Sequence, residues 1–343
     1  MKLTDLLEKM ESGISDLHLV VGEPPIFRNG GRLARTEAEP LAAEALATML
    51  VGVLPERLQG RFVLDHQSVL TSVVHAGRRF RLSASWERGQ PCAVLRAIPT
   101  RVPRLSELRI AEGPLGVLQR MAASTRGLIV VSGAAGSGKT TLMASLVEEI
   151  NATRSERIYT LVESIDYEFT NQESFVTQQE LGNDFHDFPQ ALRDLLYADP
   201  DVVMLGALTS LESIALALNL AETGHLVFVQ VGQSSAVDAL KRLVHAFPES
   251  NRAEVQRQLS NNLVGVVAQQ LLPAMGGGRV PALELLLGVP AVRGKLRQGD
   301  FDLQAIIEES TGIGMQTMAQ ALNALVASGT ITDEMAQSRM PVF

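Results

Sequence analysis

The sequence predicts an α/β protein in which a small α+β domain precedes a larger phosphate-binding domain. Three observations lead to this fold class. A glycine-rich loop at residues 133–140 stands between a strand-like apolar run and a helix-like run. From about residue 113, short apolar runs alternate with helical patterns, which is typical of a parallel sheet covered by helices. The first hundred residues instead carry alternating strands and turn signals.

The first part of the chain, residues 1–99, contains the elements of a small mixed domain. Alternation and apolar spacing predict a strand at 16–21, a helix at 40–55 and three strands within 68–99. The helix is expected to end at Pro55, because proline cannot continue it. The segment that follows is rich in proline and charge, so we expect residues 100–112 to be a linker.

The second part, residues 113–343, predicts alternating strands and helices. Four apolar runs of strand length fall at residues 127–133, 157–164, 201–207 and 225–231. Helical patterns fall at residues 187–198 and 211–224, and most of the chain from about residue 290 is expected to be helical. The first of the four runs is continuously apolar, which is typical of a strand buried on both faces of a parallel sheet.

Composition narrows the class of protein. The net charge is −8, so we expect no affinity for nucleic acid through bulk charge. The one cysteine, Cys92, cannot form a disulfide within the chain, which suits a reducing cytoplasm. The first residues carry acids and lack the apolar core of a signal peptide, and no apolar run is long enough to cross a bilayer. We therefore expect membrane association only through a partner.

The motif "GAAGSGKT" matches the phosphate-binding pattern G-x-x-x-x-G-K-[ST]. Its backbone N–H groups and the start of the following helix are expected to hold phosphate. Lys139 would reach the terminal phosphates of ATP, and the Thr140 hydroxyl would ligate Mg²⁺. The predicted nucleotide-binding residues here are Gly133, Ala134, Ala135, Gly136, Ser137, Gly138, Lys139, Thr140 and Thr141. For Thr141, packing within the helix is the commoner role of a second hydroxyl.

Together with "DPDVVMLG", "AETGHLVF" and "GIGMQTM", this loop resembles the secretion ATPases of the type IV pilus, and among them the pilus-retraction members. The resemblance covers nearly the whole chain. It implies a PAS-like N-terminal domain, a RecA-like ATPase domain with C-terminal helices, and a ring of six subunits. It also implies that nucleotide lies between the domains, where Arg79, Arg81 and Arg96 would face phosphate. A solvated strand face is the alternative reading of these three arginines.

The chain departs from the family pattern where hydrolysis takes place. The family's Walker B strand ends Gly-Glu-x-Arg-Asp, whereas here Ala207 follows the glycine and Thr209 and Ser210 replace the last two residues. The family's acidic segment Glu-Asp-Pro-x-Glu reads "ESIDYE", in which Glu163 matches and is the candidate catalytic carboxylate. A surface acid at the end of a strand is the alternative reading of Glu163.

Two further family positions have changed. The helix before the Walker B strand keeps Arg193 of its usual two arginines, and Tyr197 stands at the second position. Of the family's two histidines around the fourth strand, His225 remains and is expected near nucleotide, whereas Gly232 replaces the other. The resemblance also places a basic helix at Arg293 and Arg297, for which docking and a solvated face are both open.

These features predict an ATP-binding subunit of a hexameric pilus-retraction motor for twitching motility, with impaired hydrolysis and an accessory or regulatory role. ATP and Mg²⁺ are the expected cofactors. The expected partners are copies of itself or an active retraction ATPase, in a ring or stack, and a platform protein of the inner membrane. An active ATPase that uses Glu163 or a nearby acid is one alternative, and a nucleotide-independent scaffold is another. The expected location is the cytoplasm, peripheral to the inner membrane.

Overall fold

The computed structural model describes residues 2–10, 14–29, 32–99 and 101–340, and the chain divides into two compact units. The first unit comprises residues 1–101 together with the short segment 164–168. The second comprises residues 102–163 and 169–343. Over the described residues, no helix has both the length and the apolar character needed to cross a bilayer.

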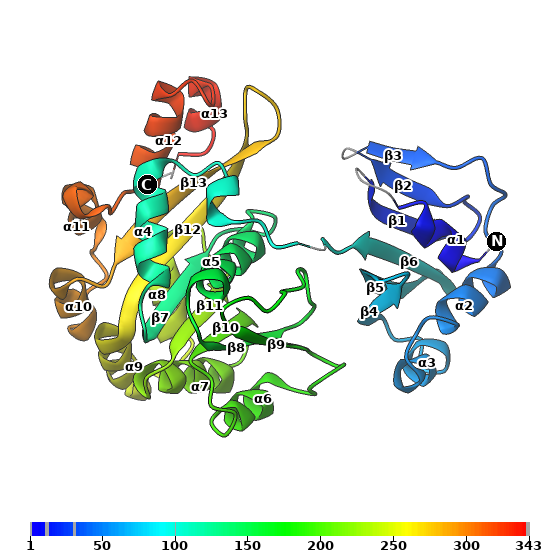
Figure 1. The fold of residues 1–343 in the computed structure, drawn as a ribbon, viewed down its shortest axis with the longest axis horizontal. Helices are drawn as coiled ribbons and strands as arrows, with labels where there is room; N and C mark the ends of the chain where they lie inside the picture. The colour runs from blue at the N-terminus through cyan, green and yellow to red at the C-terminus, as the bar shows by residue number, and fades with distance from the viewer. Residues whose placement is uncertain (1, 11–13, 30–31, 100, 341–343) are drawn as a thin grey trace. The chain divides into compact units, whose positions relative to one another are not determined.

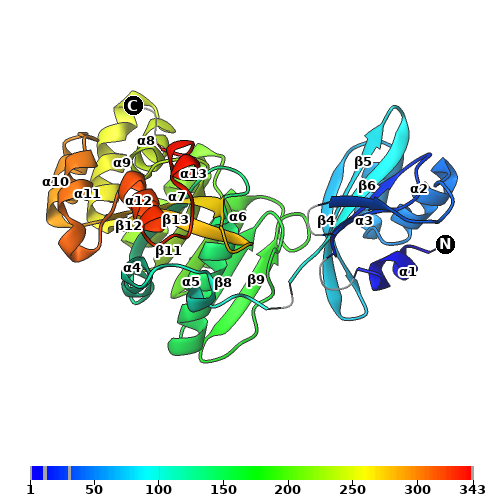
Figure 2. The ribbon, with the colours of Figure 1, turned by 90° about the horizontal axis from the view of Figure 1, so that it is seen from above.

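The first unit is a six-stranded antiparallel sheet with helices packed on one face (Figure 2). The strand order is β3-β2-β1-β6-β5-β4. Its elements are α1 (Leu3–Glu8), β1 (Ile14–Val20), β2 (Ile26–Asn29), β3 (Arg32–Arg35), α2 (Ala43–Val51), α3 (Glu56–Val63), β4 (Val69–His75), β5 (Arg78–Glu87) and β6 (Gln90–Ala97). Alternate residues of β5 are buried because they face the helices, and the residues between them form the outer, polar face.

The second unit is a seven-stranded sheet with helices on both faces (Figures 1 and 2). The order is β13-β12-β7-β11-β10-β8-β9, and all neighbours are parallel except β12 and β13. The strands are β7 (Gly127–Ser132), β8 (Arg157–Val162), β9 (Phe175–Glu180), β10 (Val202–Ala207), β11 (Leu226–Val231), β12 (Leu263–Pro273) and β13 (Arg279–Leu287). Every residue of β7 is buried, as the sequence predicts for a central parallel strand.

Helices connect and cover these strands. They are η1 (Leu105–Glu107), α4 (Glu112–Ala122), α5 (Lys139–Thr153), α6 (Phe188–Leu195), α7 (Leu211–Glu222), α8 (Ala236–His245), α9 (Glu249–Asn262), α10 (Pro290–Arg297), α11 (Gln304–Glu309), η2 (Thr311–Ile313), α12 (Met318–Ala327) and α13 (Asp333–Gln337). Asp187 and Ser210 begin α6 and α7, because their side chains accept hydrogen bonds from backbone N–H groups of the first turn. The prediction that most of the chain from about residue 290 is helical is confirmed for the described residues up to 340.

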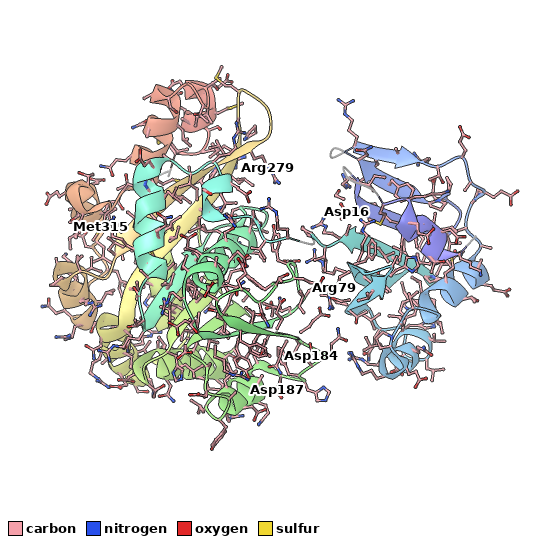
Figure 3. All side chains as sticks on the ribbon, viewed as in Figure 1. Asp16, Arg79, Asp184, Asp187, Arg279 and Met315 are labelled. Carbon is pink, nitrogen blue, oxygen red and sulfur yellow. The ribbon has the colours of Figure 1, made fainter. Side chains whose placement is uncertain are left out.

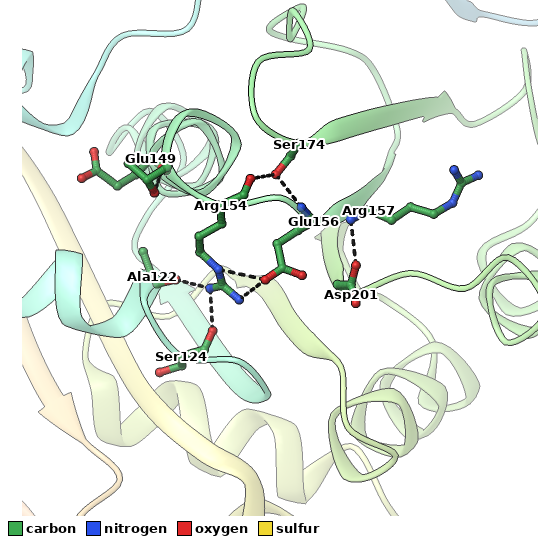
Figure 4. Close-up of polar contacts among 9 residues, drawn as sticks. Ala122, Ser124, Glu149, Arg154, Glu156, Arg157, Ser174 and Asp201 are labelled. Carbon is green, nitrogen blue, oxygen red and sulfur yellow. Dashed lines mark hydrogen bonds and ion pairs between the residues drawn. The ribbon is translucent and has the colours of Figure 1, made fainter.

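One polar cluster fixes the end of α5 that lies farthest from the phosphate loop (Figure 4). Arg154 donates to the carbonyls of Ala122 and Ser124 at 2.7 and 2.8 Å, which satisfies the open end of α4. The same guanidinium pairs with Glu156 at 2.7 Å, and Ser174 bonds the backbone of both residues. These contacts hold α4, α5 and β8 in a common frame, so the N-terminus of α5 has a fixed position.

Candidate functional site

The phosphate loop joins the end of β7 to the start of α5, as its sequence predicts. Gly133, Gly136 and Gly138 have φ angles of 147°, 76° and 89°, which side chains rarely permit. A Cβ atom on Gly138 would stand 2.6 Å from the side-chain nitrogen of Gln269. A Cβ on Gly133 would collide with the carbonyl of Gln269. Conformation therefore favours glycine at all three positions, and close neighbours also exclude a side chain at Gly133 and Gly138.

Lys139 supplies the cation of the loop. Its side chain is largely buried, and Nζ donates to the carbonyl of Ala134 at 2.7 Å, so the ammonium is folded back onto the loop. Burial lowers the pKa of Lys139 from its usual value, and a nearby phosphate would stabilise the charged form. Thr140 follows in the first turn of α5, a 15-residue helix whose N-terminus favours anions.

Gln269 on β12 supports the loop through a hydrogen bond, and the sequence analysis did not identify this residue. This residue is 4% exposed, and its Nε2 donates to the carbonyl of Ser137 at 2.7 Å. Among the described residues, Gln269 Oε1 and Ser137 Oγ are buried side-chain atoms without a hydrogen-bond partner. The glycine cradle, the cation and this polar lining fit a bound triphosphate. The available signal was a pair of glutamines within an otherwise apolar run at residues 263–273.

The carboxylate of Glu163 lies beside Ala207, the position where the resemblance places the acid of the Walker B strand. Glu163 follows β8, and Ala207 is the last residue of the neighbouring parallel strand β10. A Cβ on Gly206 would stand 3.1 Å from the carboxyl carbon of Glu163, so this carboxyl group lies directly against the end of β10. The structure therefore brings Glu163 and Ala207 together at the carboxyl-terminal ends of the parallel strands, where the phosphate loop also begins.

The three predicted arginines all face acids within the first unit. Arg79 pairs with Glu168 at 2.7 Å, and Arg81 pairs with Asp166 at 2.8 Å, both from the segment 164–168. These two acids, which stand out of register with the family pattern, thus have a partner in the described structure. Contact between the arginines and nucleotide stays a prediction.

Arg96 pairs with Asp16 of β1 at 2.7 Å, and Asp16 is 2% exposed (Figure 3 labels Asp16 and Arg79). Burial alone would raise the pKa of Asp16, but hydrogen bonds from Arg96 and Ser15 together with nearby positive charge lower it. Asp16 therefore stays charged, and Arg96 has a structural partner on the outer face of the sheet.

His225 lies at the amino-terminal ends of the parallel strands, whereas the phosphate loop lies at their carboxyl-terminal ends. It precedes β11, and its carbonyl accepts from Gly127 N at the start of β7, whereas the loop follows the far end of β7. Six residues of strand, roughly 20 Å, separate the two edges. This placement does not support a contact between His225 and nucleotide on the same loop, and the contact stays a prediction. Gly232, at the loop edge, has open space around its Cβ direction.

The two arginines of the basic helix α10 form hydrogen bonds within the second unit. Arg293 donates to the carbonyls of Asn261 and Leu263, each at 3.1 Å, and also to Gly288. Arg297 donates to the Asn261 side chain at 3.1 Å. Arg293 thus satisfies carbonyls at the C-terminal end of α9, where cations are favoured, and this contact explains its position without a docking partner.

Comparison with known proteins identifies the family. Residues 55–278 match the model of the family described as type II/IV secretion system protein. The chain is 34% identical to the type IV pilus retraction ATPase PilT of Pseudomonas aeruginosa, over 100% of this chain and 99% of the relative. It is 36% identical to the type IV pilus ATPase PilU of the same organism, over 97% and 87%.

A solved structure of the pilus retraction motor PilT with bound ADP superposes with a TM-score of 0.90 at 35% identity, covering 100% of this chain and 98% of that one. This match confirms the predicted fold, an N-terminal domain followed by a P-loop ATPase domain. The chain therefore belongs to the PilT- and PilU-like family of type IV pilus retraction ATPases.

Proposed function

We propose that this chain is an ATP-binding subunit of a pilus-retraction motor that binds Mg²⁺-ATP and hydrolyses it slowly. The observation that carries the proposal is the contrast between an intact phosphate loop and the alanine at the end of β10. Lys139, Thr140 and the glycine cradle supply binding. The side chain of Ala207 has no oxygen with which to hold magnesium or orient water.

The chemistry sets the expected size of the defect. Phosphoryl transfer depends on positioning the attacking water and stabilising the charge that spreads over the transferred group. Loss of one such group commonly lowers the rate by about 10²–10³. Binding depends mainly on the loop and is expected to survive. An accessory subunit of this kind would work in a homo-hexamer, or in a mixed ring or stack with an active retraction ATPase.

One observation favours a second candidate function, an active ATPase that uses Glu163. Its carboxyl group lies against Gly206, next to the site of the missing acid. Glu163 and the phosphate loop both follow parallel strands of the same sheet, and a carboxylate at this end of the sheet could orient a water molecule. Asp166 and Glu168 are weaker substitutes, since each is paired with an arginine.

A phosphate-release assay on the purified chain separates the candidates, with Lys139→Ala as the blank. The proposal expects turnover close to the blank and little further loss in Glu163→Gln. Fast turnover that falls by about 10² or more in Glu163→Gln would establish the second candidate. A chain that binds no ATP at all would instead be a scaffold. Within the proposal, the chain is cytoplasmic and reaches the inner membrane through a pilus platform protein.

A further inference from the structure

Glu284 on β13 is a buried carboxylate that joins the beginnings of two helices. Its two side-chain oxygens accept hydrogen bonds from backbone N–H groups, Oε1 from Ala236 at 2.6 Å and Oε2 from Met318 at 3.2 Å. The residue is 4% exposed, and burial raises the pKa of Glu284 above its usual value, whereas the two N–H groups act in the opposite direction. Because a buried charge is costly unless it is hydrogen-bonded, both donors contribute to keeping the carboxylate in this place.

Both donors occupy the same position in their helices. Ala236 is the first residue of α8, and Met318 is the first residue of α12. Each helix has its own capping residue, Ser235 or Thr317, whose side chain accepts from the N–H of the third helical residue. Glu284 accepts from the N–H of the first residue in both cases. One carboxylate therefore fixes the starts of two helices that are far apart in the sequence.

The start of α12 is held against β13 by the segment "GIGMQTM", residues 312–318. Gln316 and Leu285 exchange two backbone hydrogen bonds, at 2.8 and 3.2 Å. The side chain of Gln316 also donates to the carbonyl of Leu283 at 2.7 Å. Leu283 and Leu285 flank Glu284 on β13, so these contacts fix the place where α12 begins beside the carboxylate.

The start of α8 is connected to the phosphate loop. Ser132, the residue before the loop, is fully buried, and its hydroxyl donates to the carbonyl of Gln233. Ser234 lines two cavities beside the phosphate loop together with Ala134. Ala236 follows two residues after Ser234, so a short stretch of chain joins the surroundings of the loop to the first turn of α8.

The sheet places Glu284 and Ser132 in one row. Ala268 of β12 pairs with Glu284 on one side and with Ser132 on the other. Residues directly opposite each other on neighbouring strands project from the same face of a sheet, so both side chains lie on one face, with the small side chain of Ala268 between them. The carboxylate is therefore two strands away from the start of the phosphate loop, on the face where α8 begins.

We propose that Glu284 is a positioning residue that couples the phosphate loop to α12. The contacts run from Ser132 to Gln233, along the chain to Ala236, and through the carboxylate to Met318. The inference rests on the proposed ATP binding and adds a response of the C-terminal helices to it. Phosphate held by the loop restrains Ser132, and the contacts that follow transmit this restraint to the first turn of α12. Such a coupling is reciprocal, so loosening α12 from the carboxylate also weakens ATP binding.

The test removes one of the two hydrogen bonds without altering the carboxylate. Ala236→Pro deletes the donated N–H, and proline is favoured at the first position of a helix after an extended residue such as Ser235, whose ψ is 158°. Ala43→Pro is the matched control, because Ala43 is the first residue of α2 in the other unit and also follows an extended residue. Hydrogen exchange of peptides that contain the first turns of α12 is measured by mass spectrometry, with and without Mg²⁺-ATP, and ATP affinity is measured by calorimetry.

The inference expects ATP to slow exchange in the first turns of α12 by about fivefold in the native chain and in the control, and by less than about twofold in Ala236→Pro. ATP affinity in Ala236→Pro should fall by about fivefold as well, because the coupling is reciprocal. An undiminished effect of ATP on α12 in this variant would overturn the inference. A native chain that binds ATP without any change in α12 would refute the coupling alone, whereas a native chain that binds no ATP would refute the proposed function.

Glu284→Gln distinguishes coupling from a purely structural role. Glutamine keeps the shape of glutamate but has one acceptor oxygen, so only one of the two N–H groups retains a partner. The inference expects this variant, like Ala236→Pro, to lose the difference in α12 exchange between the ATP-bound and ATP-free states. Exchange that rises equally in both states and preserves the native difference would show that Glu284 only stabilises the fold, and this result would contradict the inference.

Discussion

Removing the amide of Gln269 is expected to loosen the phosphate loop, because this amide supports the loop through a hydrogen bond. Gln269→Met keeps the length of the side chain and deletes the donor to the Ser137 carbonyl, a hydrogen bond of 2.7 Å. Position 269 is 4% exposed, so water does not readily replace the lost donor. The apolar end group would also face Gly138, whose Cβ direction points at the present amide nitrogen.

The size of the effect follows from these contacts. A buried carbonyl left without its donor costs about 1–3 kcal/mol. In a protein or domain of 150–250 residues, each kcal/mol corresponds to roughly 2–4 °C in melting temperature. ATP affinity should fall as well, because the loop must be ordered again when phosphate binds. We expect about three- to tenfold weaker binding, equivalent to roughly 0.6–1.4 kcal/mol.

The assay is thermal unfolding with and without Mg²⁺-ATP, together with binding by calorimetry. Gln258→Met is the matched control, since this partly exposed glutamine on α9 donates to Glu222 at 2.9 Å and does not line the cavities beside the phosphate loop. If Gln269→Met unfolds and binds ATP as the control does, the bracing role of Gln269 is refuted. A loss of stability with native ATP affinity would restrict Gln269 to packing.

Three further changes test other parts of the site. Lys139→Ala should remove most of the rise in melting temperature caused by ATP, a stabilisation of about 2.7 kcal/mol at one hundred times the dissociation constant in the native chain; a full rise in the variant would contradict the assigned role. Ala207→Glu with Gly232→His should raise phosphate release more than either change alone, because such groups act together and Gly232 has space for a side chain; equal single and double variants would count against this. The pKa of Asp16 is lowered in the folded protein, so its pair with Arg96 stabilises the fold above the unfolded pKa, about 3.9. This stability is lost as the pH falls through the folded pKa. The native protein and Asp16→Asn should therefore become equally stable in acid denaturation, and a difference in stability that stays constant with pH would contradict this.

The fold was largely predictable because its main elements have local signatures. The strand β7 is continuously apolar, and the motif after it fixes the strand–loop–helix order. The edge strand β9 escaped prediction. Its sequence, "FVTQQE", is polar over its second half, and it forms a strand because its backbone pairs with β8. The β12–β13 hairpin, which gives the sheet its antiparallel edge, also escaped prediction, although its two apolar strands are joined by a glycine-rich turn.

The site was predictable as far as a motif could define it. The loop residues lie where the pattern places them, whereas Gln269 lies on a strand, 132 residues after its partner Ser137, and has no motif of its own. The sequence could not place His225 relative to the loop, since a residue before a parallel strand and one after it lie at opposite ends of that strand. The acids that pair with Arg79 and Arg81 could not be predicted, because the members of each pair lie far apart in the sequence.

The measurement that tests the central claim most directly is the identity of the nucleotide held by the native chain over time. The protein is incubated with Mg²⁺-ATP, separated rapidly from free nucleotide, and the bound nucleotide is analysed at increasing intervals. The account predicts stoichiometric binding, abolished by Lys139→Ala, in which the bound nucleotide is still ATP after many turnover times of an active retraction ATPase. Bound nucleotide that is ADP from the earliest interval, or no bound nucleotide at all, would contradict it.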